Sequence, residues 1–474
     1  MKNHLIVSSL AVLLGACSSM APTHERPAAP VPNAWPTGAA YAPAVPATTA
    51  AADIPWQQFV LDDRLRQVIA QALANSRDLR KTVADIESAR AQYRVQRAAL
   101  LPTVNAGVSG TRARSATTTG NGGGGVSTVQ TQTTSANLSV SSYEVDLFGR
   151  VRSLSDAALE TYLATEEAGR ATRVSLIAET ASAWLTLAAD RSKLALAQQT
   201  LQSAQRSMAL TQKRLDSGVA SRVDVRQAET VYQQARADLA STTTAIAQDR
   251  NALELLAGSP VADALLPTAL PATDGVVLAD VPAGLSSDVL LARPDVLLAE
   301  HQLRSANANI GAARAAFFPR LSLTAAGGVA STALASLFSG GAATVWSLAP
   351  ALTLPIFDGG ANKASLAYTQ AQQSLYVSSY ELAVQTAFQE TADALARRGT
   401  MAEQLSAQTA LVDAAADSYR LANARYTSGV DTFLTALDSQ RTLYTAQQAL
   451  ITTRLTALDN RVTLYRVLGG GVSG

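Results

Sequence analysis

A sevenfold apolar repeat, present twice in this chain of 474 residues, constrains the fold more than any other feature. The first copy reads Leu187, Leu194, Leu201, Met208 and Leu215, then Val225, Tyr232, Leu239, Ile246 and Leu253, with a polar break at 216–221. The second, shifted by 211 residues, reads Leu405, Val412, Tyr419 and Tyr426, then Ala436, Leu443, Leu450, Ala457 and Leu464, with its break at 427–432. A strict sevenfold repeat imposes a left-handed supercoil, so each copy predicts a helical hairpin packed along most of its length.

The predicted helices are unusually long. A helical pattern runs without a Gly-Pro interruption over Val151–Leu215, which at 1.5 Å per residue is about 100 Å, and Arg222–Ala257 is its shorter return. In the second copy the corresponding helices are Ala361–Tyr426 and Asp431–Val467. Few globular domains can hold helices of this length.

Two stretches have the alternation of apolar and polar residues that is typical of β-hairpins. Thr103–Arg114 and Val129–Tyr143 form the arms of a first hairpin over 103–145, and Leu321–Val329 and Val345–Leu354 form those of a second over 320–355. Each arm has about ten residues, the length of a strand that crosses a membrane. On the last arm, one face carries Trp346, Leu348, Leu352 and Leu354.

The chain is therefore predicted to consist of two structural repeats. Each contains a helix, a β-hairpin, a long helix and a return helix, and the repeats occupy 61–257 and 293–467. The first helix of the first repeat is predicted over Asp62–Leu100. Residues 258–292 form a Pro-, Ala- and Gly-rich connector, and 468–474 form a C-terminal tail.

The N-terminus has the features of a targeting segment. Lys2 precedes the apolar run Leu5–Leu14, which is too short to span a bilayer, and residues 1–16 are predicted to be a signal peptide. The run ends in Leu14-Gly15-Ala16-Cys17, which resembles the lipobox of bacterial lipoproteins, in which the cysteine is acylated after cleavage. The alternative is an ordinary signal with an incidental cysteine. Ser18, rather than Asp, favours sorting to the outer membrane. Residues 17–60 are predicted to be a lipidated tether and equatorial segment, extended over the Pro-rich part Ala21–Pro55.

Four membrane-length strands per chain cannot close a barrel, because the smallest barrels known have eight. A sheet facing lipid cannot leave open edges, since each unpaired N–H or C=O in hydrocarbon costs several kcal/mol. The barrel must therefore be shared between copies: two give eight strands and a plugged interior, and three give twelve and room for a pore. The net charge of +1 argues against a nucleic-acid partner.

These features together resemble the TolC family of outer-membrane factors, in its OprM/NodT-type lipoprotein branch. The resemblance is carried by the internal repeat, by the hairpin closures Asp146–Arg150 and Pro355–Gly360, by Arg293-Pro294-Asp295-Val296, and by two tip motifs, Arg214–Val219 and Arg425–Val430. It implies an α+β membrane protein: a homotrimer with a twelve-stranded transmembrane β-barrel, four strands from each chain, continued by a long periplasmic α-helical barrel. It also implies a periplasmic adaptor (membrane fusion) protein and an inner-membrane pump, of the proton-driven RND type, as partners.

The resemblance assigns the two helical tips to adaptor docking. The tip residues are Arg214, Ser217, Gly218 and Val219 in the first repeat, and Arg425, Ser428, Gly429 and Val430 in the second. The alternative is that they are only turns, which any helical hairpin needs.

A periplasmic gate is also implied, formed by Leu434, Asp438 and Arg441. Three copies of Asp438 would form a carboxylate ring, three copies of Leu434 a dry constriction, and Arg441 can pair with Asp438 within or between chains. The alternative is an ordinary solvated charge pair. At the equivalent place in the first repeat stands Gln227, and the nearest acid is Asp224, so their part in closure is open.

The expected function is that of an outer-membrane exit duct for drugs or other small toxic compounds, which would contribute to antibiotic resistance. A duct for type I protein secretion and a structural periplasmic coiled-coil lipoprotein are the alternatives, and the last predicts no β-hairpins. No nucleophile–base pair, phosphate loop or metal cluster stands out, so neither an enzyme nor a cofactor is expected, apart from the lipid on Cys17. The substrate and the particular pump are not indicated by the sequence.

Overall fold

A computed structural model describes residues 19–41, 51–118, 126–271, 277–281 and 286–471. The chain divides into two compact units: the first contains the described parts of Met1–Pro27, Glu87–Ala164 and Ala299–Ser379, and the second those of Ala28–Ile86, Thr165–Leu298 and Tyr380–Gly474. The predicted signal peptide and Cys17 lie outside the described residues. None of the described helices is both long and apolar enough to cross a bilayer.

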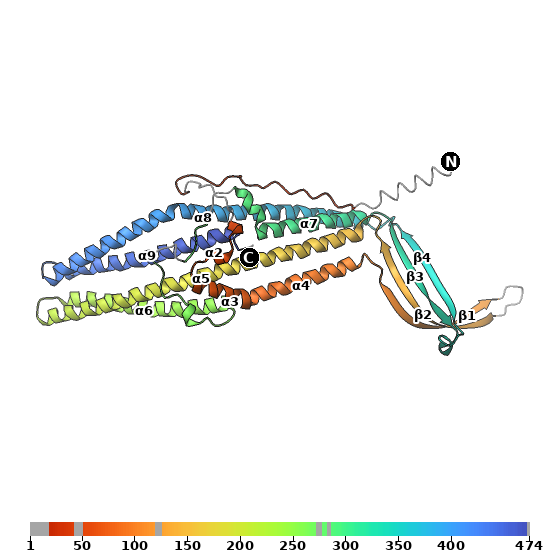
Figure 1. The fold of residues 1–474 in the computed structure, drawn as a ribbon, viewed down its shortest axis with the longest axis horizontal. Helices are drawn as coiled ribbons and strands as arrows, with labels where there is room; N and C mark the ends of the chain where they lie inside the picture. Colours follow the sequence, from red (N-terminus) through yellow and green to blue (C-terminus); the bar gives the residue numbers. More distant parts are fainter. Residues whose placement is uncertain (1–18, 42–50, 119–125, 272–276, 282–285, 472–474) are drawn as a thin grey trace. The chain divides into compact units, whose positions relative to one another are not determined.

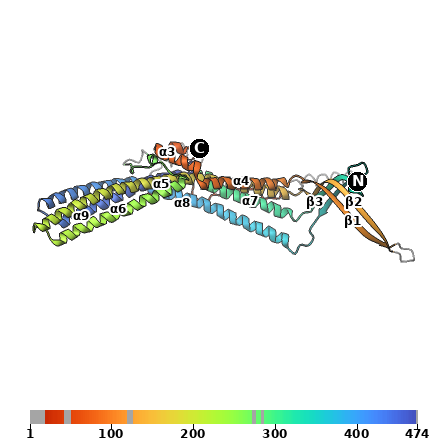
Figure 2. The same cartoon turned by 90° about the horizontal axis from the view of Figure 1, so that it is seen from below.

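The first unit contains one antiparallel sheet with the strand order β1-β2-β3-β4 (Figures 1 and 2). Its strands are β1 (Val104–Thr118), β2 (Val126–Val145), β3 (Arg320–Ser331) and β4 (Ala343–Thr353). The two predicted hairpins are both present, with β1 and β2 longer than expected, and β2 pairs with β3 so that the hairpins form a single sheet. The coiled-coil alternative, which predicts no hairpins, is contradicted.

Each hairpin is preceded and followed by a helix in the chain. α4 (Arg77–Ala98) leads into β1, and α7 (Pro294–Ala315) leads into β3. α5 (Arg150–Asp216) and α8 (Ala361–Thr427) begin in the first unit and end in the second. Both long helices occupy the ranges that the sequence predicts, and the mixed helical and strand content is confirmed.

In the second unit, α5 and α8 each turn back into a shorter helix, α6 (Arg222–Ala257) and α9 (Phe433–Val467) (Figure 1). The buried positions of α5 include a sevenfold series of small residues, Ala197, Ala204 and Thr211. The larger Leu201 of the predicted series is only partly buried. Small side chains at such positions let neighbouring helices approach closely. Leu201 keeps part of its surface exposed in the single chain.

The predicted continuous helix over Asp62–Leu100 is wrong at one position. It is broken at Ser76, whose backbone is extended (φ −53°, ψ 132°), so that α3 (Asp63–Asn75) ends before α4 begins. The Ser76 hydroxyl accepts a hydrogen bond from the Leu79 amide at 3.4 Å. Serine side chains compete for backbone amides in this way, which favours a new helix start over continuation.

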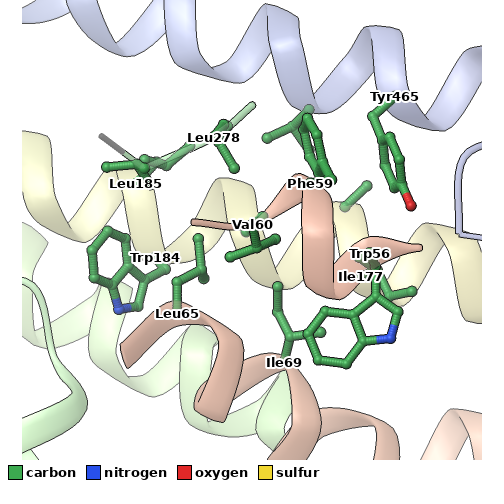
Figure 3. Close-up of a cluster of buried hydrophobic side chains, with 14 of the residues drawn as sticks. Trp56, Phe59, Val60, Leu65, Ile69, Ile177, Trp184, Leu185, Leu278 and Tyr465 are labelled. Carbon is green, nitrogen blue, oxygen red and sulfur yellow. The ribbon is translucent and has the colours of Figure 1, made fainter. Parts of the chain in front are cut away.

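A compact apolar core lies in the second unit, where segments distant in sequence meet (Figure 3). Phe59 of α2 (Trp56–Phe59) stacks on Tyr465 of α9 with ring centroids 4.0 Å apart. Trp184 of α5 is almost fully buried, and its indole N–H donates to the Leu265 carbonyl at 3.0 Å. Each such side chain contributes about 1.5 to 3 kcal/mol by leaving water. The connector and the N-terminal segment are therefore held on the long helices.

Residues 21–41 of the predicted tether contain no helix or strand, and this segment packs on the helices. In the second unit, Trp35 stacks on Phe388 of α8 at 5.3 Å. The Ser287 hydroxyl donates to the Pro32 carbonyl at 2.7 Å. Pro-rich segments make few internal hydrogen bonds, so their carbonyls are free to accept bonds from neighbouring elements.

Candidate functional site

The sheet of the first unit has one apolar face. Residues opposite one another in a sheet lie on the same side, so the strand register defines the rows of each face. The rows of this face, from β4 towards β1, are Leu352–Leu321–Val145, Pro350–Leu323–Tyr143, Leu348–Ala325–Val140–Val104, Trp346–Gly327–Leu138–Ala106 and Thr344–Val329–Ala136–Val108. The face is open in the single chain, and Trp346 is 79% exposed.

The opposite face carries small and polar side chains. Its rows include Ser347–Ala326–Ser139–Asn105 and Ala343–Ala330–Ser135–Ser109. The hydroxyls of Ser109 and Ser135 lie 3.0 Å apart, within hydrogen-bond distance across β1 and β2. A sheet with apolar residues on one side and polar ones on the other is typical of strands that separate lipid from water.

Both helical tips end in the same turn. At the first tip, the Val219 amide donates to the Arg214 carbonyl at 2.9 Å, and at the second the Val430 amide donates to the Arg425 carbonyl at 2.9 Å. Gly218 and Gly429 take the left-handed conformation (φ 74° and 76°) that this C-terminal motif requires. The remaining predicted docking residues, Ser217 and Ser428, are exposed beside them.

Arg214 joins the two tips. Its guanidinium lies over the Tyr426 ring at 4.5 Å from the centroid and donates to the Tyr426 carbonyl at 3.0 Å. Tyr426 also packs against Phe433, with centroids 5.3 Å apart. Arg425, by contrast, points into solvent and forms an ion pair with Asp431 at 3.2 Å.

The return helices begin with different caps. Ser221 and Asp224 form a reciprocal capping box at the start of α6: each side chain bonds the other's backbone amide. At the start of α9, the Thr432 side chain forms no cap. Instead, the backbone amide of Thr432 donates a hydrogen bond to the Asp431 carboxylate. The structure thus gives Asp224 a local role that the sequence leaves open. Gln227, on the following turn of α6, is partly buried.

The three predicted gate residues form an exposed stripe on α9. Leu434, Asp438 and Arg441 are spaced four and three residues apart, which puts them on one helical face, and Leu434 is 55% exposed. Arg441 donates to the Thr230 hydroxyl of α6 at 3.4 Å. Within the part of the chain that the structure describes, no ion pair joins it to Asp438.

Comparison with known families decides the identity of this architecture. The profile described as "Outer membrane efflux protein" matches residues 68–259 and 285–470. The chain belongs to the outer membrane efflux protein family. The match includes the hairpins, the long helices and both tips, and omits most of the connector.

Named relatives of the family are similar over almost their whole length. A probable efflux pump outer membrane protein, TtgC of Pseudomonas putida, is 48% identical over 471 residues, which cover 99% of this chain and 96% of the relative. The outer membrane protein OprJ of Pseudomonas aeruginosa is 45% identical over 462 residues, covering 98% of this chain and 94% of the relative.

Solved structures of family members have the same fold. A membrane protein from Pseudomonas aeruginosa is 42% identical and matches with a TM-score of 0.86, covering 95% of this chain and all of that one. The open state of the MtrE outer membrane channel of Neisseria gonorrhoeae is 38% identical, with a TM-score of 0.84, covering 96% of this chain and 99% of that one.

A polar cluster that no sequence pattern indicates holds the N-terminal segment around His24 and Arg26. The carboxylate of Glu300 in α7 is almost fully buried and accepts bonds from Arg26 and Arg304, while His24 lies 3.4 Å away. Burial opposes ionisation of Glu300, but these arginine hydrogen bonds outweigh it and lower the pKa. Arg26 and Glu300 are 274 residues apart, so no local pattern could have indicated this contact.

Among the described residues, no group of three or more His, Cys, Asp or Glu side chains is arranged so that it could hold a metal ion. The predicted lipidation residue, Cys17, cannot be compared with the structure, since it precedes the first described residue.

Proposed function

We propose that this chain is the outer-membrane exit duct of a tripartite efflux system. Three copies would each contribute four strands to one barrel, continued into the periplasm by the α5–α6 and α8–α9 hairpins. The duct would do no chemistry, since the energy and the selection of substrates belong to the pump. Its relatives are named for the export of antibiotics and toluene, which favours drugs or solvents as the substrates here.

The two-faced sheet is the observation that carries the proposal. Among the described residues, each outer strand, β1 and β4, is paired on one side only. Exposed N–H and C=O groups at both edges cannot face lipid, because each would cost several kcal/mol. Joining β4 of one copy to β1 of the next satisfies them and places the Trp346 row outside and the Ser109 row inside.

The tips would dock the adaptor and the α9 stripe would close the pore. Ser217, Val219, Ser428 and Val430 are exposed at the turns, where an adaptor hairpin could reach them. Copies of Asp438 brought together around an axis would attract cations and disfavour anions. Cys17 would carry the lipid that anchors each copy.

A photo-crosslink in living cells tests this function. A photo-reactive residue replaces Ser428 at the second tip, and the captured partner is identified by mass spectrometry. The control carries the same residue at Leu411, which is also exposed on α8 but nearly five turns from Ser428. Capture from Ser428 alone of an adaptor that serves a proton-driven pump is expected. An adaptor of an ATP-driven exporter would favour protein secretion, and capture of no periplasmic protein would contradict the docking assignment.

A further inference from the structure

An apolar groove of about 590 Å³ lies beside the first described residues of the chain. It is lined by Ser19, Met20, Ala21, Arg314, Phe317, Phe318 and Leu366, all in the first unit. Phe317 and Phe318 are 42% and 39% exposed, which is high for two adjacent aromatic rings. An apolar hollow of this kind on a protein surface marks a place where an apolar partner binds.

The N-terminal strap, residues 19–27, is fixed beside this groove by hydrogen bonds and by one close backbone approach. Arg314 donates to the Met20 carbonyl at 3.1 Å, and the Ser19 hydroxyl lies 3.3 Å from that of Ser153. Ala21 approaches α7 so closely at Gly311 that a Cβ added there would lie 2.6 Å from the Ala21 nitrogen. The position of Ser19 at the rim of the groove is therefore set by the fold.

Covalent geometry limits how far Cys17 can be from the groove. Two residues span at most about 7 Å of extended chain, so the Cys17 Cα lies within about that distance of the Ser19 Cα. Phe318 already stacks on Phe148, with ring centroids 4.8 Å apart, and acyl chains attached to Cys17 would begin close enough to reach Phe317 and Leu366. Phe317 and Phe318 stand on the link between α7 and β3, and under the proposed function that junction lies at the membrane boundary.

We infer that this groove holds an acyl chain of the lipid on Cys17. The inference rests on the proposed lipid anchor. It assigns Met20, Phe317, Phe318 and Leu366 to an acyl-binding site, with Arg314 as the residue that positions the strap. The lipid would thus be part of the folded subunit, packed against the end of α7, instead of a flexibly attached anchor.

Photo-crosslinking of the lipidated protein in its own membrane tests the site. The photo-reactive amino acid p-benzoylphenylalanine replaces Leu366 in the full-length chain, and cells are irradiated before the protein is purified and digested. The control has the same amino acid at Tyr368, which is exposed on α8 two residues away. Two residues correspond to about 200° of helical rotation, so the control points to another side of the same helix. A second control is Cys17→Ala, exported by a signal that is not lipidated.

The expected product joins the peptide that contains residue 366 to the acylated N-terminal peptide, and it is lost from the Tyr368 variant and from Cys17→Ala. An adduct with free phospholipid alone, or with a peptide from a neighbouring copy, would overturn the inference. An N-terminal peptide without acyl mass would overturn it together with the lipid anchor. Drug export by the same cells tests the duct separately, because residue 366 is in neither a tip nor the gate stripe.

Discussion

Arg214 at the tip of one helical hairpin stacks on Tyr426 at the tip of the other, with the guanidinium carbon 4.5 Å from the ring centroid. The same guanidinium donates to the Tyr426 carbonyl at 3.0 Å. The two repeats are thereby connected at their tips through one side chain. Because the Tyr426 carbonyl belongs to the turn that closes α8, the contact couples the shape of the second tip to the first.

Replacing Arg214 with Ala is expected to loosen the second tip. The cation–π contact and the hydrogen bond to the carbonyl together contribute about 1 to 2 kcal/mol, so amide hydrogen exchange in 426–433 should rise about tenfold. Arg425→Ala is the matched control, since it removes an exposed ion pair with Asp431, which water and salt screen. Equal exchange in the two variants would mean that Arg214 does not hold the tips together.

The gate stripe predicts an effect on conductance. Arg441→Ala removes the hydrogen bond to Thr230, a contact of about 1 kcal/mol, so the population of open ducts should rise about fivefold. Asp438→Ala should reduce the preference for cations by removing one carboxylate from each copy. Both are measured in planar bilayers, with sensitivity to large antibiotics as the cellular readout. Unchanged conductance in both variants would remove these residues from the gate.

A carboxyl pair between α5 and α6 predicts a dependence of stability on pH. Burial, and then the neighbouring carboxylate of Asp190, raise the pKa of Asp249 from its ordinary 3.8 to about 6, against an opposing effect of Lys193. Between about pH 4 and pH 6 the folded state therefore binds a proton that the unfolded state does not, and stability falls as the pH rises through this window. Above pH 6 this contribution is constant.

Asp249→Asn should remove that dependence, because a neutral amide neither repels Asp190 nor titrates. At pH 7.5 the variant should melt about 2 °C higher than the parent, and at pH 5 the two should differ less. Thermal unfolding in detergent at both pH values measures this. Asp238→Asn on α6 is the control. The Asp238 carboxylate accepts a hydrogen bond from the Tyr444 hydroxyl at 3.0 Å, so the stability that this variant loses should not be regained at pH 5. A parent protein whose melting does not change between the two pH values would contradict the assignment.

The sequence predicts those parts of the fold that local patterns encode. α6 begins and ends at the predicted residues, Arg222 and Ala257, because Ser221, Asp224 and Gly258 mark both ends locally. The sevenfold series predicts burial of Leu194 and Leu201, but Ala197 and Ala204 are more buried than either of them. An alanine contributes little to a hydrophobic pattern even where it forms the closest contact.

Contacts between distant segments could not be predicted in this way. Arg26 reaches Glu300 across 274 residues, and the pairing of β2 with β3 joins hairpins that the sequence treats separately. For the site residues, the sequence places Leu434, Asp438 and Arg441 on one face, but the bond from Arg441 to Thr230 depends on how α9 packs against α6. Long-range geometry of this kind leaves no periodic signal.

Gly311 tests whether the N-terminal strap depends on close backbone contact. In an isolated helix Gly→Ala is stabilising by about 1 kcal/mol, so Gly311→Ala should strengthen α7 itself. The new Cβ would meet the Ala21 nitrogen at 2.6 Å and its Cα at 2.8 Å, distances that require the strap to move. A glutamate-specific protease should therefore cut at Glu25 faster in the variant.

Gly327→Ala is the control for this experiment, because a Cβ at that position meets nothing within 4 Å. The bonds from Arg26 and Arg304 to Glu300 remain possible in both variants, so they cannot account for a difference between them. Faster cleavage in Gly311→Ala alone would mean that the fit of Ala21 against α7 holds the strap in register. If both variants are cut at the rate of the parent, the Glu300 cluster is sufficient, and the close approach at Gly311 is a consequence of docking instead of its cause.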